Sequence, residues 1–138
     1  MGAMTYDPSK QPLGGMGEGG GIWLARKALG LVFIMAGVSK LAVPTLADAF
    51  SGQLIAANLP LYDVARWAVP ITEVVVGLMM FFKLLVRPAA LAMLGMMGVA
   101  IYVHLTVQDA ALFPLQPSEP VIPILVIALA LIVLIQSR

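Results

Sequence analysis

The chain has 138 residues, of which 61% are hydrophobic and 11% are charged, and its formal net charge is +1. Soluble domains carry roughly 25% charged residues, so this composition indicates an integral membrane protein. A near-neutral charge without a basic stripe argues against a nucleic-acid partner. The absence of cysteine excludes disulfides, thiolate metal sites and cysteine-ligated iron–sulfur clusters within these residues.

The first 21 residues differ from the rest of the chain because they are rich in Gly, Pro and Met. Such a segment buries too little apolar surface to offset the entropy of ordering, so 1–21 is predicted to be a flexible tail that a partner could still order. It lacks the basic segment and the cleavage site of a signal peptide. The remainder, 22–138, is predicted to form one transmembrane domain.

Four hydrophobic stretches follow the tail, each close to the ~20 residues that an α-helix needs to cross a bilayer. They cover about residues 22–43, 65–83, 88–106 and 120–136. They are too long for strands and do not alternate strictly between apolar and polar residues. The predicted fold class is therefore all-α, a transmembrane four-helix bundle.

The connections between these stretches differ in length. Residues 44–63 form a long first connection in which Leu46, Phe50, Leu54 and Ile55 recur at helical spacing. This pattern predicts a short amphipathic helix at the outer membrane surface. The second connection, 83–87, is very short, so the second and third helices should be antiparallel neighbours.

The basic residues are distributed unevenly between the two predicted sides of the membrane. Six of the eight lie in the tail, the second connection, the C-terminus and the flanking helix ends, namely Lys10, Arg26, Lys27, Lys83, Arg87 and Arg138. The other two, Lys40 and Arg66, lie at helix ends on the opposite side. The positive-inside rule therefore predicts that both termini are cytoplasmic.

One carboxylate interrupts the second hydrophobic stretch. Glu73 is the only charged residue between Arg66 and Lys83, and at about 1.5 Å per helical residue it lies about 15 Å from the cytoplasmic interface. An acidic residue at that depth costs roughly 2.5–3.5 kcal/mol, and ionisable residues inside a membrane are by default functional candidates. We expect Glu73 to be protonated or paired with a cation; a purely structural inter-helix hydrogen bond is the alternative.

Two other side chains reach compatible depths in the outer half of the membrane. Lys40 lies about 21 Å and His104 about 25 Å from the cytoplasmic side, so both are predicted to line a pocket with Glu73. The alternatives are that Lys40 snorkels to the outer headgroups and that His104 bonds to a loop. Tyr62 and Tyr102 are predicted to offer hydroxyls to this pocket or to belong to an aromatic belt. A lone histidine cannot form a metal site, so no metal is expected.

Small residues in the spans are predicted to let helices approach closely. These are Gly30, Gly37, Gly77, Gly95 and Gly98. Methionines in the second and third spans are expected to fill the remaining gaps rather than to bind metal. They are Met79, Met80, Met93, Met96 and Met97.

Two segments carry a resemblance to a known family. The segment "LARKALGLVFIMAGVSKL" (24–41) has a basic residue, Leu-Gly, Phe, and a Gly two positions before Ser-Lys-Leu, and it resembles the first helix of the DoxX family. The segment "ITEVVVGLMMFFKLLVRPAALAML" (71–94) resembles that family's second element, and His104 falls where the family often has a histidine. The resemblance covers about residues 22–135. The Gly-rich tail has no counterpart in it.

The resemblance implies a four-helix protein of a bacterial or archaeal inner (cytoplasmic) membrane. Some members are small subunits of quinone-linked oxidoreductases such as thiosulfate:quinone oxidoreductase, and others accompany oxidative-stress or methylamine-utilisation machinery. The chain has no redox-active residue pair and no evident catalytic machinery of its own. We therefore expect an accessory subunit of a larger membrane redox or energy-converting complex, in contact with lipid and with other membrane subunits.

Two further functions remain open. The second hypothesis is a quinone or quinol site built from Glu73, Lys40, His104 and Tyr102, where a carboxylate or an imidazole exchanges protons with the headgroup. The third hypothesis is a small transporter or proton path, although four short spans without inverted repeats leave little room for alternating access. No covalently bound cofactor is expected; a quinone or a lipid is the expected ligand.

Overall fold

The computed structural model describes residues 19–137. Helices joined by turns and loops are the only regular secondary structure in that range. The elements are α2 (Gly20–Ala42), α3 (Pro44–Ala56), α4 (Tyr62–Phe81), α5 (Val86–Thr106), the short 3-10 helix η2 (Ala110–Leu112) and α6 (Val121–Gln136). The predicted all-α class is confirmed for this part of the chain. Of the predicted tail, 1–18 lies outside the described residues, whereas Gly20 and Gly21 already belong to α2.

Three helices of the described chain, α2, α4 and α5, are long and apolar enough to cross a membrane. The fourth predicted span is shorter: α6 is apolar but has 16 residues, because it begins after Pro120 and ends at Gln136. At about 1.5 Å per residue it extends about 24 Å, less than the ~30 Å hydrocarbon core of a bilayer. Of the four predicted spans, three therefore have the length to cross a membrane and the fourth is shorter.

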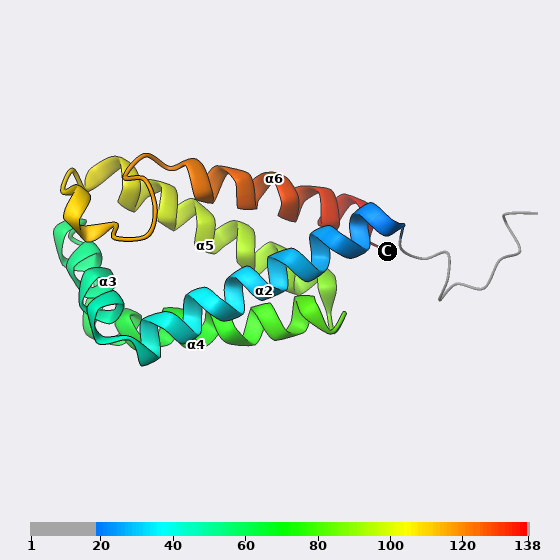
Figure 1. Ribbon diagram of the computed structural model, residues 1–138, viewed down its shortest axis with the longest axis horizontal. Helices are drawn as coiled ribbons and strands as arrows, with labels where there is room; N and C mark the ends of the chain where they lie inside the picture. The colour runs from blue at the N-terminus through cyan, green and yellow to red at the C-terminus, as the bar shows by residue number, and fades with distance from the viewer. Residues whose placement is uncertain (1–18, 138) are drawn as a thin grey trace, which may run out of the picture.

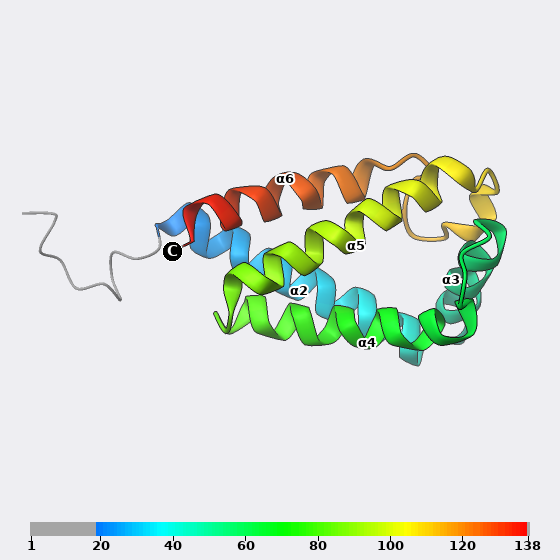
Figure 2. The same cartoon turned by 180° about the vertical axis from the view of Figure 1, so that it is seen from behind.

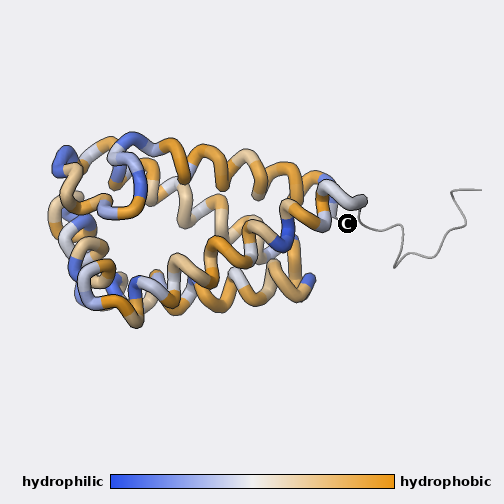
Figure 3. The backbone as a smooth tube through the Cα atoms, viewed as in Figure 1, coloured by the Kyte–Doolittle hydropathy of each residue, from blue (hydrophilic) through white to orange (hydrophobic). Residues whose placement is uncertain are grey.

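The four helices α2, α4, α5 and α6 run along the long axis of the molecule, and α3 lies across one end of them (Figure 1). The segment 107–120 lies at the same end, which we call the α3 end. The first and last described residues lie together at the opposite end, which we call the terminal end (Figure 2). Hydrophobic residues dominate the four long helices, whereas hydrophilic residues gather at the α3 end (Figure 3).

Both predicted connections have the expected form. The first contains the helix α3, in which Leu46, Phe50 and Leu54 are at least half-buried and Ile55 is exposed. The second is a tight turn from α4 to α5, and Lys83 and Leu85 adopt left-handed backbone conformations there, with φ of 60° and 52°. Short turns between antiparallel helices commonly need such conformations, because the chain must reverse within a few residues.

The helices α2 and α4 are held together by glycine. A Cβ atom on Gly30 would lie 2.7 Å from the Phe81 nitrogen, and one on Gly77 would lie 2.8 Å from the Gly30 oxygen. A Cβ atom on Gly37 would lie 2.5 Å from the Pro70 oxygen. These three glycines thus lie where α2 and α4 approach closely, because any side chain would push the two backbones apart.

The two glycines of α5 make no such contact within the described residues. A Cβ atom on Gly95 or Gly98 would meet no described atom within 4 Å, and both residues are exposed. The reason is the rotation of α5, which turns Ala89, Ala90 and Met93 toward its neighbours instead. The spacing of glycines in an apolar helix does not reveal which face is in contact.

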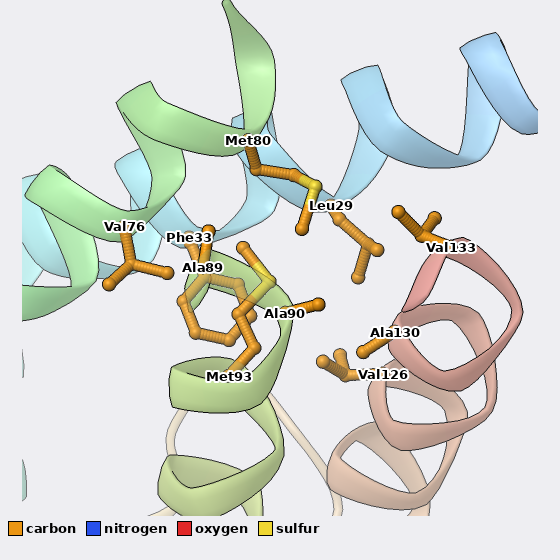
Figure 4. Close-up of a cluster of buried hydrophobic side chains, with 10 residues drawn as sticks. All are labelled: Leu29, Phe33, Val76, Met80, Ala89, Ala90, Met93, Val126, Ala130 and Val133. Atoms are coloured by element: carbon orange, nitrogen blue, oxygen red, sulfur yellow. The ribbon is translucent and has the colours of Figure 1, made fainter. Parts of the chain in front are cut away.

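Buried apolar side chains fill the half of the molecule nearest the terminal end (Figure 4). They come from all four long helices and are Leu29, Phe33, Val76, Met80, Ala89, Ala90, Met93, Val126, Ala130 and Val133. Met80 and Met93 are fully buried, and Met79, Met96 and Met97 pack against this cluster, so the methionines fill gaps as predicted.

A buried arginine closes the terminal end. Arg26 was expected at the cytoplasmic interface, yet only 4% of its surface is exposed. Its guanidinium donates hydrogen bonds of 2.7 Å to the carbonyl oxygens of Met80 and Phe81. These carbonyls lie in the last turn of α4, where helix geometry leaves acceptors without partners. Arg26 therefore fixes the end of α4 against α2.

Candidate functional site

A cavity of about 380 Å³ lies between the buried core and the α3 end. All five α-helices and the segment 107–120 contribute to its wall, which is mostly apolar. Its polar lining consists of Ser39, Lys40, Gln53, Glu73, His104 and Gln116. Small-molecule sites have volumes of roughly 300–1,000 Å³ and combine apolar walls with a few polar groups, so this cavity has the character of a ligand site.

The charged part of the wall is an ion pair between α2 and α4. The Lys40 ammonium lies 2.7 Å from Oε1 and 3.0 Å from Oε2 of Glu73, a short contact typical of charge-assisted hydrogen bonds. The Glu73 side chain is 5% exposed and the Lys40 side chain 26%. Lys40 also lies 4.9 Å from the centre of the Phe50 ring, within cation–π range.

Glycine packing explains why these two charges meet. Gly37 lies three residues before Lys40 and Pro70 lies three residues before Glu73, so each contact partner is one helical turn from the charged residue. The missing side chain at Gly37 brings α2 against the Pro70 carbonyl. The expected pairing of Glu73 with a cation is thus found, and the cation is Lys40 rather than His104.

His104 lies in the last turn of α5 and is 7% exposed. Its Nδ1 is 2.9 Å from the Ser118 carbonyl oxygen, and its ring centre is 4.4 Å from that of Phe113. This is the loop contact that the sequence offered as the alternative for this residue. A carbonyl can only accept, so Nδ1 carries the proton, and in the neutral ring Nε2 is left as an acceptor.

The tyrosines do not join the cavity. The Tyr102 hydroxyl donates a weak hydrogen bond of 3.4 Å to the Ala57 oxygen, and 49% of its surface is exposed. Tyr62 opens α4 and is 39% exposed. Neither hydroxyl lines the cavity, which leaves the aromatic belt as the other expectation for both residues. Tyr102 is two positions from His104 on α5, so it is rotated about 200° around the helix from it.

A roof formed by α3 and the segment 107–120 covers the cavity at the α3 end. The Gln53 amide donates a hydrogen bond to the Leu112 oxygen, and Leu112 lies against Gly52. Asp109 accepts a 3.0 Å hydrogen bond from the Ala111 nitrogen and caps η2. Gln53 and Gln116 were not predicted as lining residues. Only the helical spacing of α3 could have indicated Gln53, and no pattern indicates Gln116, because its place depends on how the loop folds back.

No group of three His, Asp, Glu or Cys residues that could hold a metal ion occurs within residues 19–137. The residues that line the cavity therefore offer hydrogen bonds and charge rather than a set of metal ligands. Lys40 is a donor, His104 Nε2 is an acceptor, and Glu73 accepts when ionised.

Comparison with known proteins agrees with this architecture in part. The DoxX family model matches residues 21–106, which include α2 to α5 and with them Lys40, Glu73 and His104. The match leaves α6 outside, so it is shorter than the resemblance to residue 135 that the sequence suggested. No curated protein and no solved structure matches the chain. Since the matched region covers more than half of the chain, this membrane protein belongs to the DoxX family.

Proposed function

We propose that the protein binds a quinone or quinol in the cavity beside the Lys40–Glu73 pair. The observation that carries this proposal is a mostly apolar cavity of about 380 Å³ whose wall holds an ion pair and the His104 imidazole. A quinone headgroup is a flat, largely apolar ring with two opposite oxygens. It needs apolar walls and a small number of hydrogen-bonding groups, which is what this cavity combines.

The polar residues suit both redox states of such a headgroup. The Lys40 ammonium donates to a quinone carbonyl oxygen. Glu73, when ionised, and Nε2 of His104 accept a proton from a quinol hydroxyl. A group that holds a proton within hydrogen-bond reach of a substrate oxygen is a general acid or base, and it speeds proton exchange without itself carrying electrons.

The electrons have to come from, or go to, another protein. The 138 residues contain no cysteine, so they offer no thiolates for an iron–sulfur cluster that could carry the electrons. We therefore propose that the chain acts as an accessory subunit of a larger membrane redox complex. The exposed Gly95 and Gly98 on α5 support this, because small residues on a lipid-facing helix allow close approach of a partner helix.

We further propose that α6 crosses the membrane together with α2, α4 and α5, in a bacterial inner membrane and with both termini in the cytoplasm. The first and last described residues lie at the same end of the molecule, which an even number of crossings requires (Figure 1). Lys27, Lys83 and Arg87 belong to helix ends and turns at the terminal end, as the positive-inside rule demands of the cytoplasmic side. The cavity would then lie in the outer half of the bilayer.

The test is quinone binding to the purified protein in lipid vesicles. Glu73→Gln keeps the shape of the side chain and removes its charge, and we expect at least about a tenfold loss of affinity for a chainless benzoquinone. Glu119→Gln is the matched control, because it makes the same change at an exposed carboxylate of the roof segment. Equal affinity of both variants and the unchanged protein would overturn the quinone proposal.

The subunit proposal has its own test. The protein is extracted gently with its native neighbours, and the co-purifying chains are identified by mass spectrometry. Gly95→Leu should reduce the recovery of a partner without lowering the yield of the folded protein, because its side chain meets no described residue. If the chain alone supports quinol turnover, the accessory role is wrong.

A further inference from the structure

The cavity reaches the molecular surface beside α2 and α6. Four of its lining residues in these helices, α5 and the roof are both apolar and exposed: Val32 (47%), Val99 (52%), Leu115 (78%) and Ile122 (41%). Three of the four belong to α2, to α6 and to the segment that leads into α6. The side on which α2 faces α6, with the roof segment 113–120 next to it, is the front of Figure 1.

The contacts between neighbouring helices indicate between which two of them the cavity opens to the surface. The side of α2 that faces α4 is closed by Gly30 and Gly37, so a cavity-lining side chain of α2 that is also exposed lies toward α6. Val32 is such a residue. Ile122 is an exposed lining residue of α6, the helix that packs against α2 as well as against α5. An apolar opening therefore lies between Val32 and Ile122.

The roof is held in place by two hydrogen bonds, and one polar residue of it, the exposed Gln116, also lines the cavity. The roof is tied to itself by the hydrogen bond from Gln53 to the Leu112 oxygen and to α5 by the bond between His104 and the Ser118 oxygen. Phe113, which stacks on His104, is 4% exposed. The exposed lining residues of α2 and α6 are apolar, whereas the carboxylate of Glu73, 5% exposed, lies inside.

The polarity of this arrangement orients a ligand. Lys40 and Glu73 form a pair without net charge at the inner end, and the opening is apolar. A volume of about 380 Å³ is near the lower end of the roughly 300–1,000 Å³ of small-molecule sites, so it holds a headgroup and the first carbons of a chain, not a long chain. The remainder of the chain must leave through the opening.

We propose that the ligand is a single-chain amphiphile with an uncharged headgroup, which passes from the membrane between α2 and α6 and keeps its hydrocarbon chain between Val32 and Ile122. This rests on the proposed quinone site and adds to it a route and a requirement for the chain. A two-chain phospholipid does not fit, because a volume of about 380 Å³ holds a headgroup and the first carbons of one chain, not of two.

Cysteine labelling can test the route, since the chain has no native cysteine. Single variants Val32→Cys and Ile122→Cys place a thiol at the opening, and Met35→Cys places one at an exposed position of α2 outside the cavity wall. Val99→Cys reports on the alternative seam between α4 and α5. Each variant is labelled with a maleimide in phosphatidylcholine vesicles, without ligand, with a decyl-benzoquinone, and with the same ring lacking the chain.

We expect the decyl-benzoquinone to slow labelling of the Val32→Cys and Ile122→Cys variants by about tenfold at saturation, and the chainless ring to slow it little. The Met35→Cys variant should react equally in all three conditions. Protection of the Val99→Cys variant alone would overturn the proposed route, as would equal protection by both quinones. Slow labelling of the Val32→Cys and Ile122→Cys variants in phosphatidylcholine vesicles without any quinone would mean that a two-chain lipid occupies the opening. That result would overturn the proposal of a single-chain ligand.

Affinity for the chainless ring separates this inference from the function on which it rests. If that ring binds and Glu73→Gln weakens it, but the chain protects neither Val32→Cys nor Ile122→Cys, the quinone site stands and the route is wrong. If neither quinone binds, both fail. Val32→Trp adds a kinetic measurement: narrowing the opening should slow association of the decyl-benzoquinone and leave that of the chainless ring unchanged.

Discussion

The two halves of this molecule are built from the same four helices but are packed differently: one is filled with apolar side chains and the other contains a cavity. At the terminal end, Arg26, Gly30 and Gly77 bring α2 against α4, and ten buried apolar residues fill the space between all four helices. At the α3 end the pair α2–α4 stays closed at Gly37, while a cavity separates it from α5 and α6. The filled half fixes the positions of the four helices. Because the same helices continue into the other, open half, they hold the polar side chains in place around the cavity.

The helices that lie opposite each other, α2 and α5, and α4 and α6, show why the cavity stays open. Within the described residues, α2 contacts α4 and α6, and α5 contacts α4 and α6, but α2 and α5 make no close backbone contact, nor do α4 and α6. At the terminal end side chains such as Leu29, Phe33 and Met93 bridge the middle. Toward the α3 end Ala36, Ser39 and Ala100 line the cavity, and these small side chains cannot reach across it.

The largest expected effect comes from disturbing the closed half. Gly77→Ala places a Cβ atom 2.8 Å from the Gly30 oxygen, a backbone atom that cannot move alone, so we expect a loss of about 1–3 kcal/mol of stability. Gly95→Ala makes the same change where no described atom is near, and alanine stabilises a helix relative to glycine by about 1 kcal/mol. The thermal midpoints of the two variants in detergent should move in opposite directions.

That contrast can fail in a clear way. If Gly77→Ala is as stable as Gly95→Ala, the close approach of α2 and α4 is not required, and the explanation of the closed half is wrong. Gly30→Ala provides a second measurement of the same contact, because its Cβ atom would lie 2.7 Å from the Phe81 nitrogen on the opposite helix.

The ion pair should give the next largest effect, since it lies between the closed helix pair and the cavity. Lys40→Met leaves Glu73, whose side chain is 5% exposed, without its cation. Breaking a buried pair costs about 3–5 kcal/mol, and we expect the lower end because Lys40 is only partly buried. The double variant Lys40→Met/Glu73→Gln removes both charges and should recover part of the loss.

A double-mutant cycle measures this coupling. Unfolding of the two single variants, the double variant and the unchanged protein gives the interaction free energy, which for contacting charges is about 0.5–3 kcal/mol. Additive effects of the two substitutions would show that Lys40 and Glu73 do not stabilise each other, and the wall of the cavity would then need a different explanation.

The pairing of Lys40 with Glu73 and a pocket beside them were within reach of the sequence, whereas most of the residues that line this cavity were not. The depth of a residue in the membrane follows from counting residues along its helix. Charged residues of opposite sign at similar depths are therefore candidates for an ion pair, and few such residues occur here. The direction in which a residue faces does not follow from depth. This is why Gly95, Gly98 and Tyr102 were expected in contacts that the rotation of α5 turns outward.

Arg26 illustrates a second limit of sequence reasoning. Its charge and its place near the end of a span predicted an interfacial residue, and it does lie at the terminal end. Its burial depends on the carbonyls of Met80 and Phe81, which come from a helix more than fifty residues further along the chain. The composition of a span identifies the membrane class and the helices, but acceptors supplied by another helix end appear only once the helices are assembled.

The smallest effect is expected at the roof of the open half. Gln53→Leu replaces the amide by an apolar side chain of similar size and removes the hydrogen bond to the Leu112 oxygen, which should cost about 1 kcal/mol. The global stability should therefore change little, but amide hydrogen exchange in 107–113 should become faster because the segment loses its attachment to α3. Gln108→Leu is the matched control, since the Gln108 amide bonds only to the Leu105 oxygen one turn before it. Faster exchange in both variants, or in neither, would mean that Gln53 does not hold the roof in place, and the contrast between a cavity closed at the α3 end and open toward lipid would be lost.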